Sequence, residues 1–316
     1  MLKDPVNSSR IAIVFPGALG DLICAGPAIA AIARRHSGAS IELIARAELA
    51  RFANGRMGIA RGHSIDRREI AACFTESDEA AAAVREFLGV FNRIYSFYAA
   101  DDARFRAALA KAAGGPVSFH PFRPDGPGHV SAGYLCSIGE TQDDLKFRIE
   151  PTPEDFANAS RAFEAAGCEP ARTVVIFPGS GSSGKNWPLE NFVAAASMLS
   201  SRWNTLFVLG PAEQSMEPSL RARRIEVVND VELGTIAAVA RLAAGFIGND
   251  SGVSHLAAAC GARGIAIFGP TDPERWRPIG AIEVLQGNPP DSVTSEAVAS
   301  ALMRQLSGAA ISNLRS

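Results

Sequence analysis

The fold is decided by the stretch Gly248-Asn249-Asp250-Ser251-Gly252-Val253-Ser254-His255-Leu256-Ala257-Ala258-Ala259-Cys260-Gly261. The apolar run 243–247 before it predicts a strand that ends at Gly248. Asp250 or Ser251 is a suitable cap for a helix that starts directly afterwards. A second apolar run, 265–268, predicts another strand. We therefore expect a strand–helix–strand unit, as found in parallel sheets that are covered by helices.

The start of this helix predicts an anion site. Ser251 and Gly252 expose backbone N–H groups at the first helical turn, where the helix dipole also favours negative charge. Ser251 and His255 are four residues apart and share a helix face, so the imidazole lies close to an anion bound at that end. We interpret the segment as half of a diphosphate site.

The composition indicates a two-domain globular protein. The chain has 316 residues, of which 47% are apolar and 20% charged, and this exceeds the length of one average domain. A formal net charge of -2 argues against a general nucleic-acid binder. The five cysteines form no C-x-x-C pair, which fits a reducing cytoplasm better than a zinc or disulfide framework. The apolar segment 22–33 is too short to span a bilayer.

Basic residues are concentrated between Arg46 and Arg68, where Glu48 and Asp66 are the only acids. Such a stretch fits an anionic partner, for example phosphates or an anionic membrane surface. It fits a plain solvated surface equally well. The sequence leaves these two interpretations open.

The order of elements predicts two Rossmann-like halves, residues 1–150 and 151–316, each with a parallel sheet. Phe15-Pro16-Gly17 and Phe177-Pro178-Gly179 close the first strand of each half and form a coarse internal repeat. The linker is placed near Pro151. Strands are expected at 10–15, 41–45, 93–98, 116–120, 173–177, 206–209, 226–228, 245–248 and 264–268. Helices are expected at 21–35, 69–88, 105–113, 130–138, 154–166 and 292–306.

The loop 179–186 almost matches a phosphate loop of the form G-x-x-x-x-G-K-[ST]. Asn186 stands where that motif has a magnesium-binding hydroxyl, so a nucleoside triphosphatase is disfavoured. A Gly/Ser loop with free N–H groups and the ammonium of Lys185 still suits a phosphate. A flexible surface loop with a solvated lysine is the alternative.

Asp21 is the candidate catalytic residue of the first half. It follows a glycine-lined turn at the carboxyl end of the first strand, where ligands bind in open α/β sheets, although a simple helix cap would also explain it. The turn lacks G-x-G-x-x-G, and Glu42 is the only acid placed for a ribose, so a dinucleotide enzyme is disfavoured. The five histidines lack metal-ligand spacing. We therefore expect no metal and no cofactor, with Lys185, Arg275 or Arg277 and helix N-termini neutralising the phosphates.

In combination, these motifs resemble the ADP-heptose:lipopolysaccharide heptosyltransferases, glycosyltransferase family 9, of GT-B fold. The resemblance is carried in order by residues 17–21, 177–179, Lys185 with Trp187-Pro188, 249–252 with His255, and 268–273 with Trp276 and Pro278. The segment 248–276 is highly specific, whereas 46–139 matches only loosely.

The resemblance implies that the second half holds the sugar nucleotide and that Asp21 is the catalytic base. It places Glu213 on the ribose, Val231 beside the adenine and His255 near the diphosphate. The implied nucleotide-sugar residues are Ser180, Lys185, Glu213, Val231, Asp250, Ser251, Gly252 and His255. Because Asp21 and Lys185 belong to different halves, we expect catalysis to require closure about a hinge near Pro151.

The expected activity is an inverting, metal-independent transfer of a heptose from ADP-heptose to a sugar hydroxyl of a lipopolysaccharide-core-like acceptor, a glycan or glycolipid. The enzyme would be cytoplasmic, with peripheral contact at the cytoplasmic face of the inner membrane. Two alternatives remain open. One is a GT-B enzyme that uses another donor, such as a UDP-sugar transferase or epimerase, and the other is a non-catalytic nucleotide-binding relative.

Overall fold

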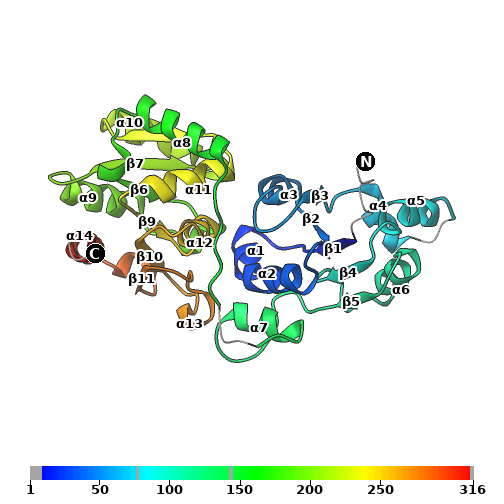
Figure 1. Cartoon of the computed structure of the whole chain (residues 1–316). Coiled ribbons are helices and arrows are strands. Elements are labelled where there is room, and N and C mark those ends of the chain that lie inside the picture. Colours follow the sequence, from blue (N-terminus) through cyan, green and yellow to red (C-terminus); the bar gives the residue numbers. More distant parts are fainter. Residues whose placement is uncertain (1–8, 76–77, 142–144, 314–316) are drawn as a thin grey trace. The chain divides into compact units, whose positions relative to one another are not determined.

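The computed structural model describes residues 9–75, 78–141 and 145–313 and divides the chain into two compact units between Leu145 and Lys146. Each unit is built on one parallel sheet (Figure 1). The aromatic residues are unevenly divided between the units. The chain has three tyrosines, Tyr95, Tyr98 and Tyr134, all in the first unit, and three tryptophans, Trp187, Trp203 and Trp276, all in the second.

The first unit has a five-stranded sheet with the order β3-β2-β1-β4-β5, in which all neighbours are parallel. The strands are β1 (Arg10–Val14), β2 (Ser40–Ala45), β3 (Arg61–Ser64), β4 (Arg93–Ser96) and β5 (Val117–Phe119). The helices are α1 (Leu19–Cys24), α2 (Gly26–Arg35), α3 (Ala47–Ala53), α4 (Arg68–Ala71), the 3-10 turn η1 (Ala72–Phe74), α5 (Asp78–Leu88), α6 (Ala103–Ala112) and α7 (Val130–Ser137).

Both faces of the central strand β1 are buried, as expected for a parallel sheet between helices. Ala12 and Val14 pack with residues of η1, α5 and α6. Ile11 and Ile13 alternate with them and point to the opposite face, because side chains alternate along a strand.

The second unit has a six-stranded parallel sheet with the order β11-β10-β9-β6-β7-β8. The strands are β6 (Thr173–Phe177), β7 (Asn204–Leu209), β8 (Glu226–Asn229), β9 (Gly245–Asn249), β10 (Gly264–Phe268) and β11 (Ile282–Gln286). The main helices are α8 (Pro153–Ala165), α9 (Leu189–Leu199), α10 (Glu217–Ala222), α11 (Leu233–Leu242), α12 (Gly252–Ala259), α13 (Pro273–Trp276) and α14 (Ser295–Asn313). Short 3-10 turns are η2 (Pro170–Arg172), η3 (Ser183–Lys185), η4 (Pro211–Met216) and η5 (Pro290–Ser292).

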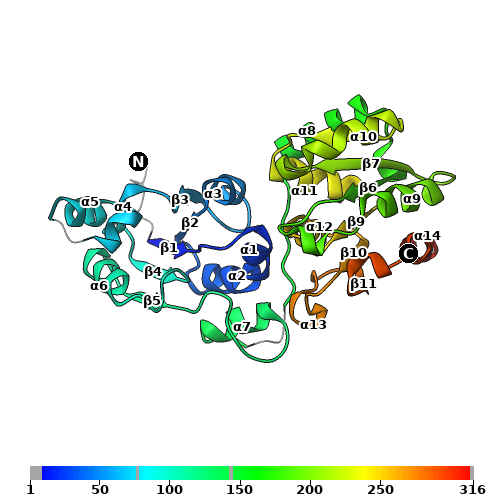
Figure 2. The ribbon, with the colours of Figure 1, turned by 180° about the vertical axis from the view of Figure 1, so that it is seen from behind.

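The helices of the second unit form two layers. Residues of α9, α10 and α14 share one buried cluster with alternate side chains of β6, β7, β9 and β10. Helices α8, α11 and α12 form a second group, in which α11 contacts both α8 and α12. The reverse view shows how the strands run between the helices within each unit (Figure 2).

Several predicted elements have different bounds in the structure. The helix expected at 21–35 is two helices, because Ala25 ends α1 and caps α2 and Pro27 lies in the first turn of α2, where its missing N–H is tolerated. The helix expected at 69–88 is divided into α4, η1 and α5. The prediction also missed α3 and β3 within the basic stretch, and the edge strand β11.

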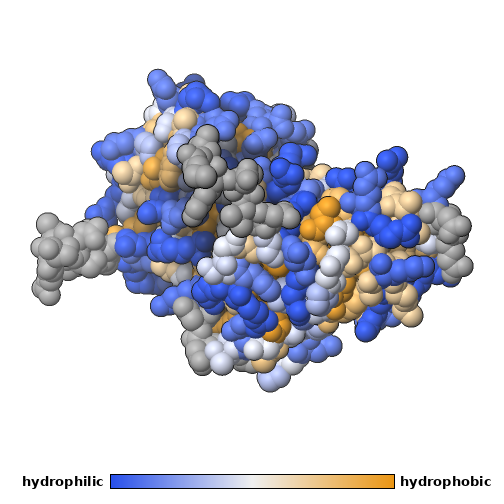
Figure 3. Space-filling view, turned by 45° about the vertical axis from the view of Figure 1, so that its right-hand side comes forward, coloured by the Kyte–Doolittle hydropathy of each residue, from blue (hydrophilic) through white to orange (hydrophobic). Residues whose placement is uncertain are grey.

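None of the described helices is long and apolar enough to cross a membrane. The space-filling view shows hydrophilic residues over most of the visible surface, with apolar residues in small patches between them (Figure 3). Among the described residues, the large exposed apolar side chains are Val90, Phe122 and Met198, which are 45%, 37% and 37% exposed. They are scattered along the sequence, as is normal for single exposed apolar residues.

Candidate functional site

The predicted nucleotide residues follow the carboxyl ends of strands of the second sheet. The strand order reverses between β6 and β9, which are neighbours although β7 and β8 separate them in sequence. Ligands of open α/β sheets bind outside the carboxyl ends of the strands at such a point. Ser180 and Lys185 follow β6, Glu213 follows β7, Val231 follows β8, and Asp250 to His255 follow β9.

Asn249 ties the two loops of this switch point together. Its Nδ2 donates to the carbonyl of Pro178 at 2.8 Å, and its Oδ1 accepts the backbone N–H of Trp187 at 2.9 Å. The side chain is fully buried. Asn249 thereby fixes both ends of the loop that carries Ser180 and Lys185.

Lys185 and Asp250 form an ion pair across the switch point. The Nζ of Lys185 lies 2.7 Å from Oδ2 of Asp250, with the lysine side chain 35% exposed and the aspartate 6%. Ser251 caps α12 and accepts the N–H of Ser254. The ammonium is therefore held beside the N-terminus of α12, where backbone N–H groups and the helix dipole favour an anion.

The other predicted nucleotide residues lie on α12 and on the segments after β6, β7 and β8. His255 is buried on α12, one turn after the cap. Glu213 accepts the N–H of Gly210 at 3.1 Å, and a Cβ at Gly179 would overlap the Glu213 carboxylate. Val231 is half-buried beyond β8. The hydroxyl of Ser180 donates to the carbonyl of Ser182 at 2.7 Å and so shapes the loop before Lys185.

The arginines proposed for phosphate neutralisation have local partners. The guanidinium of Arg275 lies over the ring of Trp276 at 5.8 Å. Arg277 donates to the carbonyl of Ile282 at 3.4 Å.

Asp21 lies in the first unit, at the corresponding switch point between β1 and β4. It is buried in the first turn of α1, and its Oδ2 accepts the N–H of Ala18 at 3.1 Å. A Cβ at Gly17 would lie 2.7 Å from the Cβ of Asp21, so the glycine allows the turn to approach the acid. The structure corrects the alternative role of a simple cap, because α1 begins at Leu19 with Ala18 as its N-cap. Asp21 is the third helical residue, and one oxygen of its carboxylate accepts the N–H of Ala18.

Sequence reasoning missed Arg123, which pairs with Asp21 from the segment after β5. Its Nε lies 2.8 Å from Oδ1 and its Nη2 lies 3.0 Å from Oδ2. These hydrogen bonds raise the pKa of the Arg123 guanidinium above its ordinary value. No local pattern marks Arg123, because its partner is 102 positions away in the sequence.

Glu42, the acid considered for a ribose, has a structural role instead. Arg10 holds its two oxygens at 2.7 and 3.0 Å, and Nε2 of His63 lies 2.6 Å from Oε2. Burial acts to raise the pKa of Glu42, but the hydrogen bonds from His63 and Arg10 outweigh it and lower the pKa to about 2. Arg10 and His63 both hydrogen-bond the Glu42 carboxylate. These bonds compensate for its burial, which explains why a carboxylate is tolerated at this strand position.

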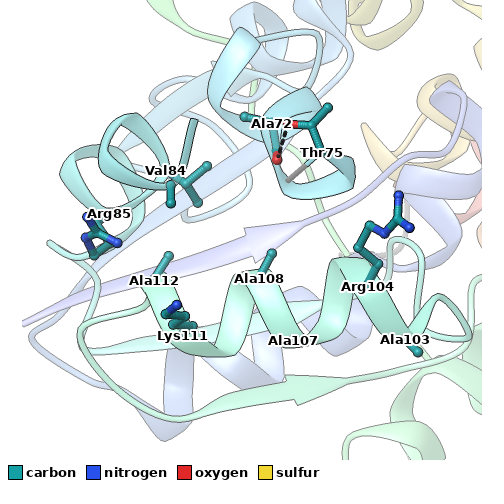
Figure 4. A pocket seen from close by; sticks show the side chains of 11 residues that line it. Ala72, Thr75, Val84, Arg85, Ala103, Arg104, Ala107, Ala108, Lys111 and Ala112 are labelled. Carbon is teal, nitrogen blue, oxygen red and sulfur yellow. Dashed lines mark hydrogen bonds between the residues drawn. The ribbon is translucent and has the colours of Figure 1, made fainter. Parts of the chain in front are cut away.

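A separate pocket of about 730 Å³ lies between η1, α5 and α6 of the first unit. Alanine side chains form much of its wall, with Arg85 and Lys111 near one end and Arg104 at the other (Figure 4). None of the predicted site residues lines it, and its described lining holds no carboxylate, histidine or cysteine.

Comparison with solved structures identifies the fold. The chain is similar to a glycosyl transferase family 9 protein from Veillonella parvula, with 18% identity, a TM-score of 0.77, and 96% of this chain and 98% of the other covered. It is similar to E. coli ADP-heptose lps heptosyltransferase II, with 15% identity, a TM-score of 0.72 and coverages of 94% and 98%. It is also similar to E. coli heptosyltransferase WaaC with ADP, with 19% identity, a TM-score of 0.69 and coverages of 94% and 99%.

These similarities and the two Rossmann-like sheets define the GT-B class of α/β fold, as predicted. Residues 141–299, half of the chain, match the model of Glycosyltransferase family 9 (heptosyltransferase). The chain belongs to glycosyltransferase family 9, which confirms the resemblance noted in the sequence. The matched segment contains the predicted nucleotide residues but not Asp21. No curated protein sequence matches the chain.

Proposed function

We propose that this glycosyltransferase transfers a heptose from ADP-heptose, with inversion and without a metal, to a sugar hydroxyl of a lipopolysaccharide-core-like acceptor. The observation that carries the proposal is the Lys185–Asp250 pair at the N-terminus of α12, at the strand switch point of the matched family segment. A fixed ammonium and free helical N–H groups suit a diphosphate. The E. coli protein WaaC, with the same fold, was solved with ADP.

The proposed chemistry assigns one role to each unit. The acceptor hydroxyl gives its proton to the Asp21 carboxylate while its oxygen forms a bond to the anomeric carbon. The bond from that carbon to the diphosphate breaks, and ADP leaves with the electron pair. Lys185 and the start of α12 stabilise the negative charge that grows on the leaving diphosphate. Attack from the face opposite the leaving group inverts the anomeric carbon.

Nucleotide binding tests the donor. We expect ADP, with EDTA as well as with magnesium, to raise the melting temperature. A ligand at about a hundred times its dissociation constant adds about 2.7 kcal/mol to the free energy of unfolding. UDP, GDP and NAD should give smaller shifts. Lys185→Ala should lose most of the ADP shift, because it removes the ammonium beside the helix N-terminus. A larger shift with UDP, or one that requires magnesium, would contradict the proposed donor or its metal independence.

Turnover tests the catalytic base. Asp21→Asn keeps the size of the side chain but removes its basicity, so we expect transfer from ADP-heptose to fall by about a hundredfold or more. The ADP-induced melting shift should persist, because Asp21 lies outside the unit that carries the nucleotide residues. Retained transfer in a folded Asp21→Asn variant would overturn the base assignment.

We also propose that the basic stretch 46–68 contacts an anionic membrane surface. Its exposed members include Arg46, Arg51 and Arg61, whereas Arg67 is engaged with Glu69 and the ring of Phe87. Replacing Arg51 and Arg61 together by glutamate should weaken sedimentation with anionic vesicles, because the surface would then repel them. Arg241→Glu, an exposed change in the second unit, is the control. Equal binding by all three proteins would favour a solvated surface.

A further inference from the structure

The two oxygens of Asp21 have different surroundings in the described structure. A carboxylate offers about four acceptor positions, two on each oxygen. On Oδ2, the described donors are the N–H of Ala18 at 3.1 Å and Nη2 of Arg123 at 3.0 Å, which fill both positions. On Oδ1, the one described donor is Nε of Arg123 at 2.8 Å. One acceptor position of Oδ1 is therefore left for a further proton donor.

The arginine that creates this difference is held by its own surroundings. Its side chain is 55% exposed, whereas that of Asp21 is 6% exposed. The guanidinium lies over the ring of Phe122 at 5.2 Å, and Phe122 packs edge-on against Phe15 at the end of β1. The backbone of Arg123 has a φ of 54°, which is unfavourable for a residue with a Cβ. Such a conformation persists only where neighbouring contacts determine it.

A second polar group at this carboxylate makes no competing bond. The hydroxyl of Tyr134 is buried, faces the backbone of Arg123, and makes no described hydrogen bond to Asp21. Burial raises the pKa of Tyr134 and the negative charge of Asp21 raises it further, which outweighs the lowering effect of the backbone N–H of Arg123, so the phenol stays neutral. Arg123 is therefore the side chain that orients the Asp21 carboxylate.

Building on the proposed function, we propose that Arg123 is a positioning residue for the base. Its two parallel hydrogen bonds fix the carboxylate plane so that the remaining acceptor position of Oδ1 takes the proton of the acceptor hydroxyl. The electron pair of that O–H bond forms the new bond to the anomeric carbon, and Arg123 keeps its charge throughout. A lysine cannot reproduce the planar two-bond geometry, although it keeps the charge.

The test compares transfer from ADP-heptose to a heptose-free core oligosaccharide in wild type, Arg123→Gln and Arg123→Lys. We expect kcat to fall about 10- to 100-fold in Arg123→Gln, because a displaced carboxylate loses its alignment with the acceptor. The KM for ADP-heptose and the ADP-induced melting shift should not change. Arg123→Lys should recover part of kcat. Arg123→Asn gives a second loss variant whose residue type tolerates the left-handed backbone.

Arg106→Gln is the matched control, because Arg106 also lies over a phenylalanine ring, at 4.9 Å from Phe119, but has no described bond to Asp21. A kcat within twofold of wild type in folded Arg123 variants would overturn the inference, provided that Asp21→Asn is inactive. An equal loss in Arg106→Gln would also overturn it. Transfer retained in Asp21→Asn would overturn the base assignment and this inference together.

Discussion

The glycine of each Phe-Pro-Gly turn lies against an acid that the proposed function uses. Gly17 leaves room for Asp21, and Gly179 leaves room for the carboxylate of Glu213. A side chain at either position would enter the space of the acid. The repeated tripeptide therefore does more than end a strand, because it sets how closely the turn approaches a carboxylate to which we assign a role.

Gly179→Ala should displace Glu213 and weaken ADP binding. The added methyl group would overlap the carboxylate, and overpacking of this kind costs about 1–3 kcal/mol in stability. Gly181→Ala is the matched control in the same loop, since a Cβ there would meet nothing within 4 Å. Melting temperatures with and without ADP measure both effects. Equal ADP shifts in the two variants would contradict a role of Glu213 in ADP binding.

The buried Glu42 should make stability depend on pH in the acid range. Its pKa is about 2 in the folded chain and 4.5 ordinarily, so its contribution is complete above pH 4.5 and is lost as the pH falls toward 2. At pH 7 we expect Glu42→Gln to cost on the order of 2 kcal/mol, after allowance for solvent around the partly exposed Arg10.

Urea denaturation of wild type and Glu42→Gln at pH 7 and pH 3 measures this difference. It should be smaller at pH 3, because part of the wild-type stabilisation has then been lost. Glu48→Gln, at an exposed position of α3, controls for the loss of one negative charge. A difference that is the same at both pH values would show that the interaction does not depend on ionised Glu42.

At the scale of elements, the site of the second unit depends on two loops that meet only because β6 and β9 are neighbours. Asn249, at the end of β9, donates to the carbonyl of Pro178 and accepts the N–H of Trp187. These two residues flank the loop that follows β6. Its amide is suited to this task because it supplies a donor and an acceptor in one plane. These two hydrogen bonds hold the loop of Lys185 beside β9, where Lys185 pairs with Asp250 in the predicted phosphate site.

Asn249→Asp should destabilise the second unit and weaken the hold of Asn249 on the loop of Lys185. The change removes the donor to Pro178 and introduces a charge in a buried position, at a cost of about 3 kcal/mol. ADP binding should weaken as well, because the loop with Lys185 is no longer fixed. Asn204→Asp makes the same chemical change at an exposed position and should be near neutral. Urea denaturation measures the loss in the free energy of unfolding. Equal stability of the two variants would show that the hydrogen bonds of Asn249 do not stabilise the fold.

The fold was largely predictable because most central strands are continuous apolar runs with turn residues at their ends. Strands β6 and β10 have the predicted bounds. The two strands that were missed, β3 and β11, are both edge strands, which need no apolar run because they are partly exposed. The strand β3 reads Arg-Gly-His-Ser and has no fully buried residue, and so it was taken as part of a charged stretch.

Within the candidate site, local motifs identified residues that act through nearby backbone, such as the Ser251 cap. Pairs formed by folding were not predictable. Arg123 meets Asp21 only because β5 lies beside β4 and β4 beside β1 in the sheet. The ion pair of Lys185 with Asp250 likewise follows from the neighbouring strands β6 and β9. Both residues of that second pair were selected for phosphate contact, not for contact with each other.

At the scale of the whole molecule, each unit has its own sheet and its own buried cluster. Units of this kind are expected to unfold as separate cooperative transitions. Calorimetry should therefore resolve two transitions, and ADP should raise the temperature of one of them, because the predicted nucleotide residues all lie in the second unit. A single transition that ADP shifts as a whole would show that the units unfold together.

The division of aromatic residues supplies an optical label for each unit. Tryptophan emission reports only on the second unit, and tyrosine absorbance changes report only on the first, since each residue type is confined to one unit. Trp187 is especially informative, because its backbone N–H is held by Asn249 beside the loop of Lys185. The unlabelled native chain thus carries two spectroscopic signals, one for the second unit with the loop of Lys185 and one for unfolding of the first unit.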